Sequence, residues 1–287
     1  MQNASGTRSV SGLNAVKCGC SCSELRPIKK PVLSRSETAA QDREIFAKQQ
    51  KGSRKHTDMD SKEIFNGFSA ETFRFLLEIG FNNNADWFEA NRKRYEQFVR
   101  DPMRRLAAAL MPTALDIDGN FNPSINASVS RIRRDTRFTK DKSPYRDHMW
   151  IGFRYPRTRI SEGCTLWFEI TPHRYDYGCG FYSSTPAFMA AYRKKILAAP
   201  MKFLELAHSL EARGFVYSCE SYRRDRFPDA PAELKPYLNV KTFAWMKTIP
   251  GVGALIAPSN ILDVLTDEFS ALAPMYHFLR SVISENV

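Results

Sequence analysis

Basic side chains crowd one short stretch of the chain. The sixteen residues from 131 to 146 read RIRRDTRFTKDKSPYR, and seven of them are cationic: Arg131, Arg133, Arg134, Arg137, Lys140, Lys142 and Arg146. Arginine offers a planar fork that pairs with two oxygens of a phosphate or carboxylate, and lysine adds a mobile point charge. We therefore predict that this stretch, called the basic segment below, binds an anionic ligand.

Two carboxylates and one phenol are interleaved with these cations. Asp135 and Asp141 stand beside several arginines, so they are expected to be ionised and either to orient the arginines or to serve as acid or base in catalysis. Tyr145 follows Pro144 and is placed either to donate its hydroxyl to a bound oxyanion or to anchor the start of a strand. The alternative for the whole basic segment is a salt-bridged surface loop.

Helical periodicity precedes the basic segment. The pattern predicts three helices, over 69–80, 84–99 and 101–111. Ser69 is placed to cap the first of them, and the turn formed by Asn82, Asn83 and Asn84 supplies a cap for the second. Pro112 is expected to end the third, because proline cannot donate the backbone hydrogen bond of a helix interior.

The middle of the chain has the composition of β-strands. Strands are predicted over 129–134, 148–155, 165–171 and 174–182, and the last three alternate as half-buried strands do. An antiparallel meander is the natural interpretation. If the first stretch joins the sheet, Arg131 and Arg133 lie on its polar face.

Alternation divides the side chains of these strands between two faces. The apolar face is expected to meet the core and carries Met149, Ile151, Phe153, Tyr155, Leu166, Phe168, Ile170, Tyr175, Tyr177, Cys179 and Phe181. The other face carries Trp150, Gly152, Arg154, Trp167, Glu169, Asp176, Gly178, Gly180 and Tyr182. Its glycines leave a shallow floor that lets a ligand or another backbone approach closely, and its aromatic rings could stack a base beside the arginines. A helix packed over the glycines is the alternative.

Helical patterns return after the strands. Thr185 with Pro186 opens one helix, Pro200 opens another that Gly214 closes, and a third starts at Ile261. Pro274 is expected to kink or split this third helix. The order of the elements predicts an α+β fold, a mainly antiparallel central sheet flanked by N-terminal and C-terminal helices.

Composition limits the class of protein. The chain has 287 residues, a formal net charge of +11 and 43% hydrophobic residues, which is enough for a sizeable core. No apolar run approaches the roughly 20 residues that span a bilayer, so we expect no membrane partner. We predict a single domain over 61–287 and a disordered basic extension over 1–60. That extension either lies upstream of a true start at Met59 or acts as a targeting tail.

Cysteine and histidine residues show no metal-binding pattern. Cys18, Cys20 and Cys22 have no fourth ligand nearby, and the five histidines are widely scattered, so we predict no metal site. The few dispersed cysteines favour a reducing compartment, the cytoplasm, with an organelle as the alternative if the extension is a transit peptide. The sequence does not identify a cofactor.

Three stretches give the sequence a resemblance to a known family. They are RDTRFTKDKSPYR at 134–146, FNGFSAETFRFLLEIGFNNNADWFEANRKRYE at 65–96 and FYSSTPAFMAAYRKKI at 181–196. On these residues the chain resembles the family called domain of unknown function 2461, from about Ile64 to the C-terminal helix. Relatives usually carry an aromatic or apolar residue before the Arg-Asp pair, where this chain has Arg133, so its strand is more cationic. The resemblance implies no activity.

Three functions remain open from the sequence. The first is an enzyme acting on a phosphorylated or nucleotide-like small molecule, with Asp135 or Asp141 as acid or base; a pocket holding a carboxylate of raised pKa would favour it. The second is a nucleic-acid-associated protein, which an extended basic stripe would favour. The third is an interaction module in which these charges pair with one another without a cavity. We favour a phosphate-bearing ligand, either an anionic small molecule or a nucleic acid, bound at the basic segment.

Overall fold

A computed structural model describes residues 64–137, 140–156, 163–250 and 260–284. The predicted extension over 1–60 lies outside these ranges, as does the cysteine cluster within it. Both therefore stay predictions.

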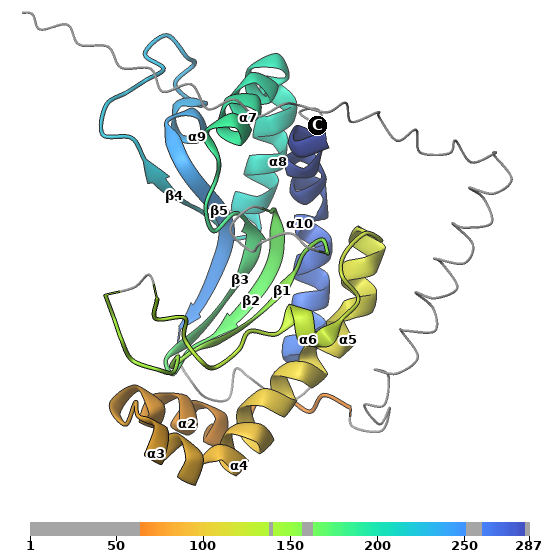
Figure 1. The fold of residues 1–287 in the computed structure, drawn as a ribbon. Helices are drawn as coiled ribbons and strands as arrows, with labels where there is room; N and C mark the ends of the chain where they lie inside the picture. The colour runs from red at the N-terminus through yellow and green to blue at the C-terminus, as the bar shows by residue number, and fades with distance from the viewer. Residues whose placement is uncertain (1–63, 138–139, 157–162, 251–259, 285–287) are drawn as a thin grey trace, which may run out of the picture. The chain divides into compact units, whose positions relative to one another are not determined.

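The centre of the fold is a five-stranded antiparallel sheet (Figure 1). Its strands are β1 (Met149–Phe153), β2 (Thr165–Ile170), β3 (Arg174–Gly180), β4 (Val216–Ser221) and β5 (Val240–Pro250). The spatial order is β1-β2-β3-β5-β4, with each neighbouring pair antiparallel. The predicted meander of three strands is confirmed, and β5 inserts between β3 and β4.

The predicted strand over 129–134 is wrong. Only isolated bridges occur there, between Val129 and Ile151 and between Arg133 and Tyr145. The chain contacts β1 around Ser130, whose amide donates to the Trp150 carbonyl at 2.8 Å and whose hydroxyl accepts from the Trp150 amide at 3.0 Å. It then folds back on itself, so that its next backbone hydrogen bonds go to residues 144–146 and not to the sheet.

Several short helical elements and one long helix, α5, precede the sheet. They are α2 (Ala70–Phe81), α3 (Ala85–Ala90), α4 (Arg92–Tyr95), the π-helical turn η1 (Glu96–Arg100), α5 (Asp101–Ile117) and α6 (Ile125–Ser128). The Asn84 side chain caps α3 by accepting from the Trp87 amide at 2.9 Å. The predicted end before Pro112 is wrong: Pro112 faces solvent, and Met111 and Ala114 continue the buried stripe that holds α5 together.

Four helices follow β3. They are α7 (Pro186–Ala198), α8 (Pro200–Ala212), α9 (Lys235–Leu238) and α10 (Asn260–Ser284). The Thr185 hydroxyl caps α7 as predicted, accepting from the Phe188 amide at 3.1 Å. Pro274 does not split α10, because it is exposed while Leu272 and Met275 beside it are buried. Among the described helices none is both long and apolar enough to cross a membrane.

The long helices pack on one face of the sheet. Helix α5 contacts β1, α10 contacts β3, α7 contacts β5 and α8 contacts β4, and in Figure 1 these four helices lie on the same side of the strands. The apolar face predicted for β1, β2 and β3 is the buried one, with Ile151, Phe168 and Tyr177 side by side across the three strands. The predicted α+β fold is therefore confirmed, and the polar face is left open.

Two glycines of β3 face the backbone of β5 at close range. A Cβ atom on Gly178 would lie 2.1 Å from the carbonyl oxygen of Trp245, and one on Gly180 would lie 2.6 Å from the Cα of Ala244. These glycines were expected to let either a ligand or another backbone approach closely. At Gly178 and Gly180 it is the backbone of β5 that does so. The insertion of β5 beside β3 depends on this approach.

We predict that Gly178→Ala destabilises the protein by about 1 to 3 kcal/mol, because a Cβ there forces β5 to shift. Urea unfolding measures the difference. Gly119→Ala is the matched control, since a Cβ there would meet its nearest neighbour, the Leu115 carbonyl oxygen, at 3.9 Å. Equal stability of the two variants would contradict the close approach.

Candidate functional site

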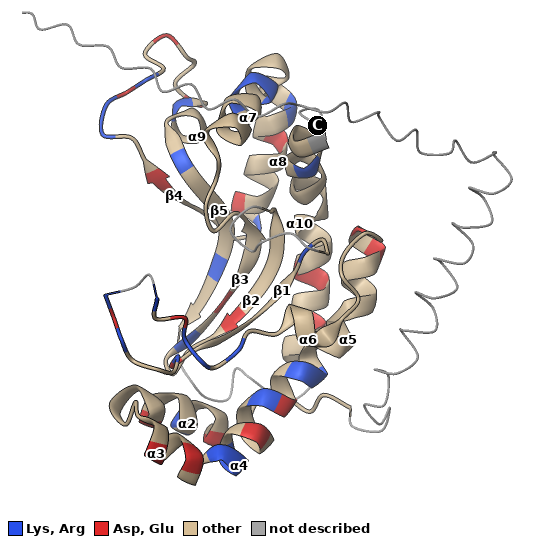
Figure 2. Cartoon of the chain, in the orientation of Figure 1, with Lys and Arg blue, Asp and Glu red and all other residues tan. Residues whose placement is uncertain are grey.

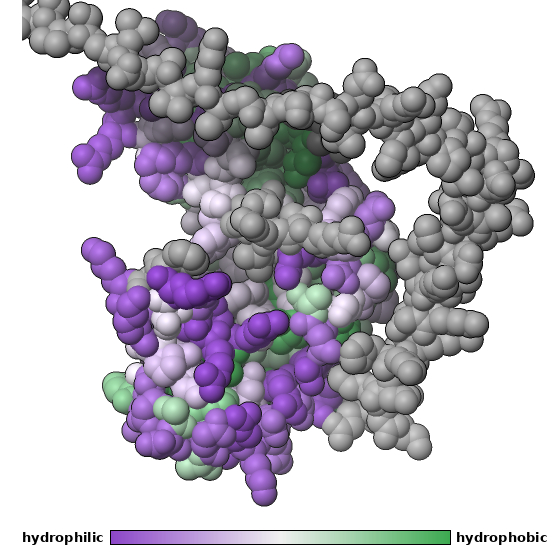
Figure 3. All heavy atoms as spheres, in the orientation of Figure 1, coloured by the Kyte–Doolittle hydropathy of each residue, from purple (hydrophilic) through white to green (hydrophobic). Residues whose placement is uncertain are grey.

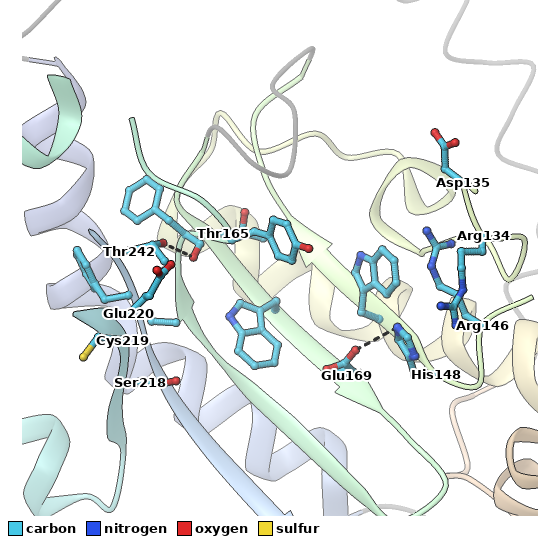
Figure 4. Close-up of a pocket in the computed structure, with 17 residues that line it drawn as sticks. Arg134, Asp135, Arg146, His148, Thr165, Glu169, Ser218, Cys219, Glu220 and Thr242 are labelled. Carbon is cyan, nitrogen blue, oxygen red and sulfur yellow. Dashed lines mark hydrogen bonds and ion pairs between the residues drawn. The ribbon is translucent and has the colours of Figure 1, made fainter. Parts of the chain in front are cut away.

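A groove of about 820 Å³ lies on the open face of the sheet (Figure 4). The basic segment forms one end of it through Arg134, Asp135 and Arg146. Trp150, Trp167 and Glu169 line its floor, and residues of β4 and β5 line the far end. The shallow aromatic and charged floor expected from strand alternation is therefore present, and no described helix is part of its lining.

Arg134 and Arg146 lie side by side at one end of the groove (Figure 4). Arg146 donates through Nη1 to the carbonyl oxygens of Arg131 and Arg133, at 2.6 and 2.7 Å, and its guanidinium lies 4.8 Å from the ring centroid of Trp150. Burial, and then the neighbouring charge of Arg134, lower the pKa of Arg146. Within the described ranges no carboxylate is ion-paired with Arg146. The charge of Asp135 opposes this lowering of the pKa, but as the smallest of the three effects.

The guanidinium of Arg134 is only partly satisfied. Its Nη1 donates to the Asp141 carboxylate. Its Nε is buried and has no hydrogen-bond partner among the described residues. The buried Nε is not open to a ligand, so an incoming anion would meet Arg134 through the terminal nitrogens of its guanidinium, beside Arg146.

The remaining cations of the basic segment point elsewhere. Arg137 pairs with Asp135 at 2.7 Å, and Lys142 donates to the Thr136 carbonyl oxygen at 2.8 Å. Arg133 lies 5.5 Å from the ring centroid of Tyr145. Arg131 and Lys140 are exposed. In Figure 3 this part of the surface is strongly hydrophilic. The segment thus brings Arg134 and Arg146 together at the groove and spreads its other cations over the surface.

The two aspartates of the basic segment are held ionised. Hydrogen bonds from Arg137 lower the pKa of Asp135 to about 2. Hydrogen bonds from Ser143, with the charge of Arg134, lower the pKa of Asp141. Both are exposed, and Asp135 points away from Arg134 and Arg146 in Figure 4. Such carboxylates orient arginines well, whereas a general acid needs a raised pKa; their catalytic role stays a prediction.

Tyr145 ties the basic segment to the N-terminal helices. Its ring is fully buried and stacks on Phe88 at 4.2 Å between centroids. Its amide donates to the Asn83 side-chain oxygen at 2.9 Å, and its carbonyl oxygen accepts from the Asn83 side-chain nitrogen at 3.0 Å. Tyr145 was expected either to donate its hydroxyl to a bound oxyanion or to act as an anchor. These contacts are those of an anchor. Its hydroxyl is buried away from the groove lining.

A histidine and a glutamate meet on the groove floor. His148 Nδ1 is 2.8 Å from Asp147 Oδ1, and His148 Nε2 is 3.8 Å from Glu169 Oε1 (Figure 4). Burial is the main cause that raises the pKa of Glu169; Asp176 adds to the rise, while His148 opposes it. A carboxyl with a raised pKa beside an imidazole is suited to proton exchange.

Sequence reasoning missed this pair as a unit. It placed Glu169 on the open face, and the same two-residue spacing extended back from Trp150 would have placed His148 there too. Their meeting depends on the register in which Trp150 lies opposite Glu169. The pair also lines a second cavity of about 540 Å³, next to Leu77 and Phe81 of α2.

The residues of the groove lie within a region that is shared with a protein family. The family described as Conserved hypothetical protein (DUF2461) matches residues 71–278. The chain belongs to this family. The matched region contains the basic segment, all five strands and every residue of the groove. No curated protein matches the chain, so the groove itself must indicate the function.

The raised pKa of Glu169 predicts a pH-dependent stability. Because the folded protein holds this proton more tightly than the unfolded chain, the contribution is present below the usual value of 4.5 and is lost as the pH rises above it. Glu169→Gln cannot ionise, so its free energy of unfolding relative to the wild type should rise between pH 4.5 and pH 8. Urea unfolding at several pH values measures it, with Glu205→Gln on the exposed side of α8 as control. A difference that is flat with pH would contradict the assignment.

Proposed function

We propose that the protein binds a phosphate-bearing, nucleotide-like ligand in the groove. The phosphate lies at Arg134 and Arg146, and the planar ring lies on the sheet beside Trp150 and Trp167. One observation carries the proposal: two adjacent arginines, one without an acidic partner in the described chain, share a groove with two tryptophans.

The anion end is supported by electrostatics. Two guanidinium groups side by side repel each other, and partial burial strengthens that repulsion. A phosphate neutralises both and accepts two parallel hydrogen bonds from one arginine fork. The two carbonyl contacts already fix Arg146, so little side-chain freedom is lost when a ligand binds.

The ring end is supported by the register of the sheet. Trp167 lies opposite Gly152 of β1 and opposite Gly178 of β3, neither of which carries a side chain. The floor on both sides of this indole is therefore low. Flat space beside an aromatic ring suits a stacked base.

The groove also supports an enzymatic form of the proposal. Arg146, His148 and Trp150 line it at two-residue spacing, so the histidine lies between the anion end and the ring end. A ligand that spans the two ends passes over the His148–Glu169 pair. Acid–base chemistry on that ligand is then the kind of reaction this groove supports.

We place the protein in the cytoplasm as part of this proposal. Cys164, Cys179 and Cys219 carry free thiols, as proteins of reducing compartments commonly do. An organelle is the alternative if residues 1–60 act as a transit peptide.

Removing the arginine pair tests the proposal. In Arg134→Gln/Arg146→Gln, the affinity for adenosine monophosphate should fall at least tenfold, because each charge-assisted hydrogen bond is worth about 1.5 to 3 kcal/mol. Isothermal titration calorimetry measures it. Arg74→Gln/Arg92→Gln removes the same charge from exposed helix positions and should bind like the wild type.

A folded double variant that binds like its control would contradict the anion site. Circular dichroism checks the fold. Arg134→Gln alone gives a second test, since Arg146 also holds two backbone carbonyls and Arg134 has no such role.

Replacing Trp167 tests the ring end separately. Trp167→Leu should lower the affinity for adenosine monophosphate about fivefold or more, because the stacking of the base is lost. Its affinity for inorganic phosphate should not change, because the arginines remain. Titration of both ligands gives the comparison, and an equal loss for the two would place the ring elsewhere.

A further inference from the structure

A second basic segment lies at the opposite edge of the sheet. The chain leaving β4 reads YRRDR over 222–226, and Arg223, Arg224 and Arg226 are exposed. We call it the far basic loop. The ring of Tyr222 supports it, with the Arg226 guanidinium 3.7 Å from the ring centroid. Figure 2 shows clustered cationic residues both on this loop and on the basic segment.

The groove connects the two basic segments. It extends from Arg134 and Arg146 beside β1 to Ser218 and Glu220 on β4, immediately before the far basic loop. In the order β1-β2-β3-β5-β4 the outer strands are separated by four spacings of about 4.8 Å, or about 19 Å. A mononucleotide has its phosphate next to its base and so meets one cationic end. A chain of nucleotides presents phosphates to both.

An exposed aromatic residue lines the groove between its ends. The side chain of Tyr182 is 83% exposed, which is unusual for so large a ring. With Trp150 and Trp167 it gives the groove three aromatic side chains that are at least partly exposed, in addition to the buried Phe181 and Phe243 of the lining. Cationic grooves with aromatic platforms are the means by which proteins hold single-stranded nucleic acids, because every base has a face that stacks.

Two acidic residues of the lining carry little uncompensated charge. Asp135 is paired with Arg137, and Glu220 with Lys241. They therefore do not form a negative barrier to a polyanion at either end. Positive charge lines the end beside β1 through Arg134 and Arg146, and at the other end it follows the last lining residue on β4, in the exposed arginines of the far basic loop.

We propose that the ligand of the groove is a single-stranded nucleic acid. Its phosphates lie at the basic segment and at the far basic loop, and its bases stack on Trp150, Trp167 and Tyr182. The inference rests on the proposed function, because it uses the same groove and the same Arg134 and Arg146. A duplex does not fit this floor, since its base faces are already stacked on one another.

Fluorescence anisotropy with the full chain and labelled dT8 and rU8 tests the proposal. Either octamer should bind at least tenfold more tightly than adenosine monophosphate, and a duplex of eight base pairs should bind more weakly than the better octamer. Arg223→Gln/Arg224→Gln should lower octamer affinity at least tenfold and leave adenosine monophosphate unchanged. For this variant the negative slope of log K against log salt concentration should become shallower by about 1.4. This corresponds to about 0.7 for each of the two lost phosphate contacts.

The matched control is Lys194→Gln/Lys202→Gln. It removes the same charge from exposed positions on α7 and α8, which pack on the other face of the sheet, and should bind octamers like the wild type. Tyr182→Ala should weaken octamer binding about fivefold or more without affecting inorganic phosphate.

Three results would overturn the inference: octamer binding no tighter than that of adenosine monophosphate, equal losses in the arginine and lysine variants, or equal affinity for the duplex. If adenosine monophosphate still binds, the proposed function survives while the nucleic-acid inference fails. If adenosine monophosphate, inorganic phosphate and the octamers all fail to bind, the proposed function fails as well.

Discussion

The alternation of side chains along β1, β2 and β3 is the constraint on which the site depends. Helices α5, α7, α8 and α10 cover one face of the sheet and bury its apolar side chains. Every second residue must then project from the other face. Trp150, Trp167 and Glu169 are brought into one groove by this alternation and by register alone. A slip of one residue would exchange the two faces and remove both core and groove.

The basic segment is held in place by contacts that involve no ligand. Tyr145 packs on Phe88 and shares two hydrogen bonds with Asn83, which ties the segment to the turn between α2 and α3. Arg146 in turn holds the backbone carbonyls of Arg131 and Arg133, earlier in the same segment. The fold therefore fixes two like charges side by side, and their repulsion is offset by packing elsewhere. A site of this kind is preorganised for an anion.

How much could be predicted from the sequence follows from the range of the interactions. Local patterns predicted α2, α7 and the two faces of β1, β2 and β3. Two strands were missed although Phe243 and Trp245 alternate on β5, because Lys241 and a bulge near Ser221 obscure the pattern. Long-range packing also keeps α5 continuous past Pro112 and α10 continuous past Pro274, where the local pattern predicted an end and a kink or split. The arginine cluster was visible as composition, but which of its members face the groove depends on how the segment folds back.

The charge distribution in the groove determines how a ligand would lie. Glu169 makes the centre of the floor less favourable for phosphate than the end beside β1, where Arg134 and Arg146 lie, and the Asp176 opposite it on β3 is already paired with Arg174. A phosphate-bearing chain therefore lowers its energy by placing phosphates at the ends and bases at the centre. There Glu169, whose pKa is raised by burial, can hydrogen-bond a base edge, as an acceptor when it is ionised and as a donor when it is protonated. A base edge can therefore be bound at a carboxyl that a phosphate has no reason to approach, and the groove separates the two parts of one ligand.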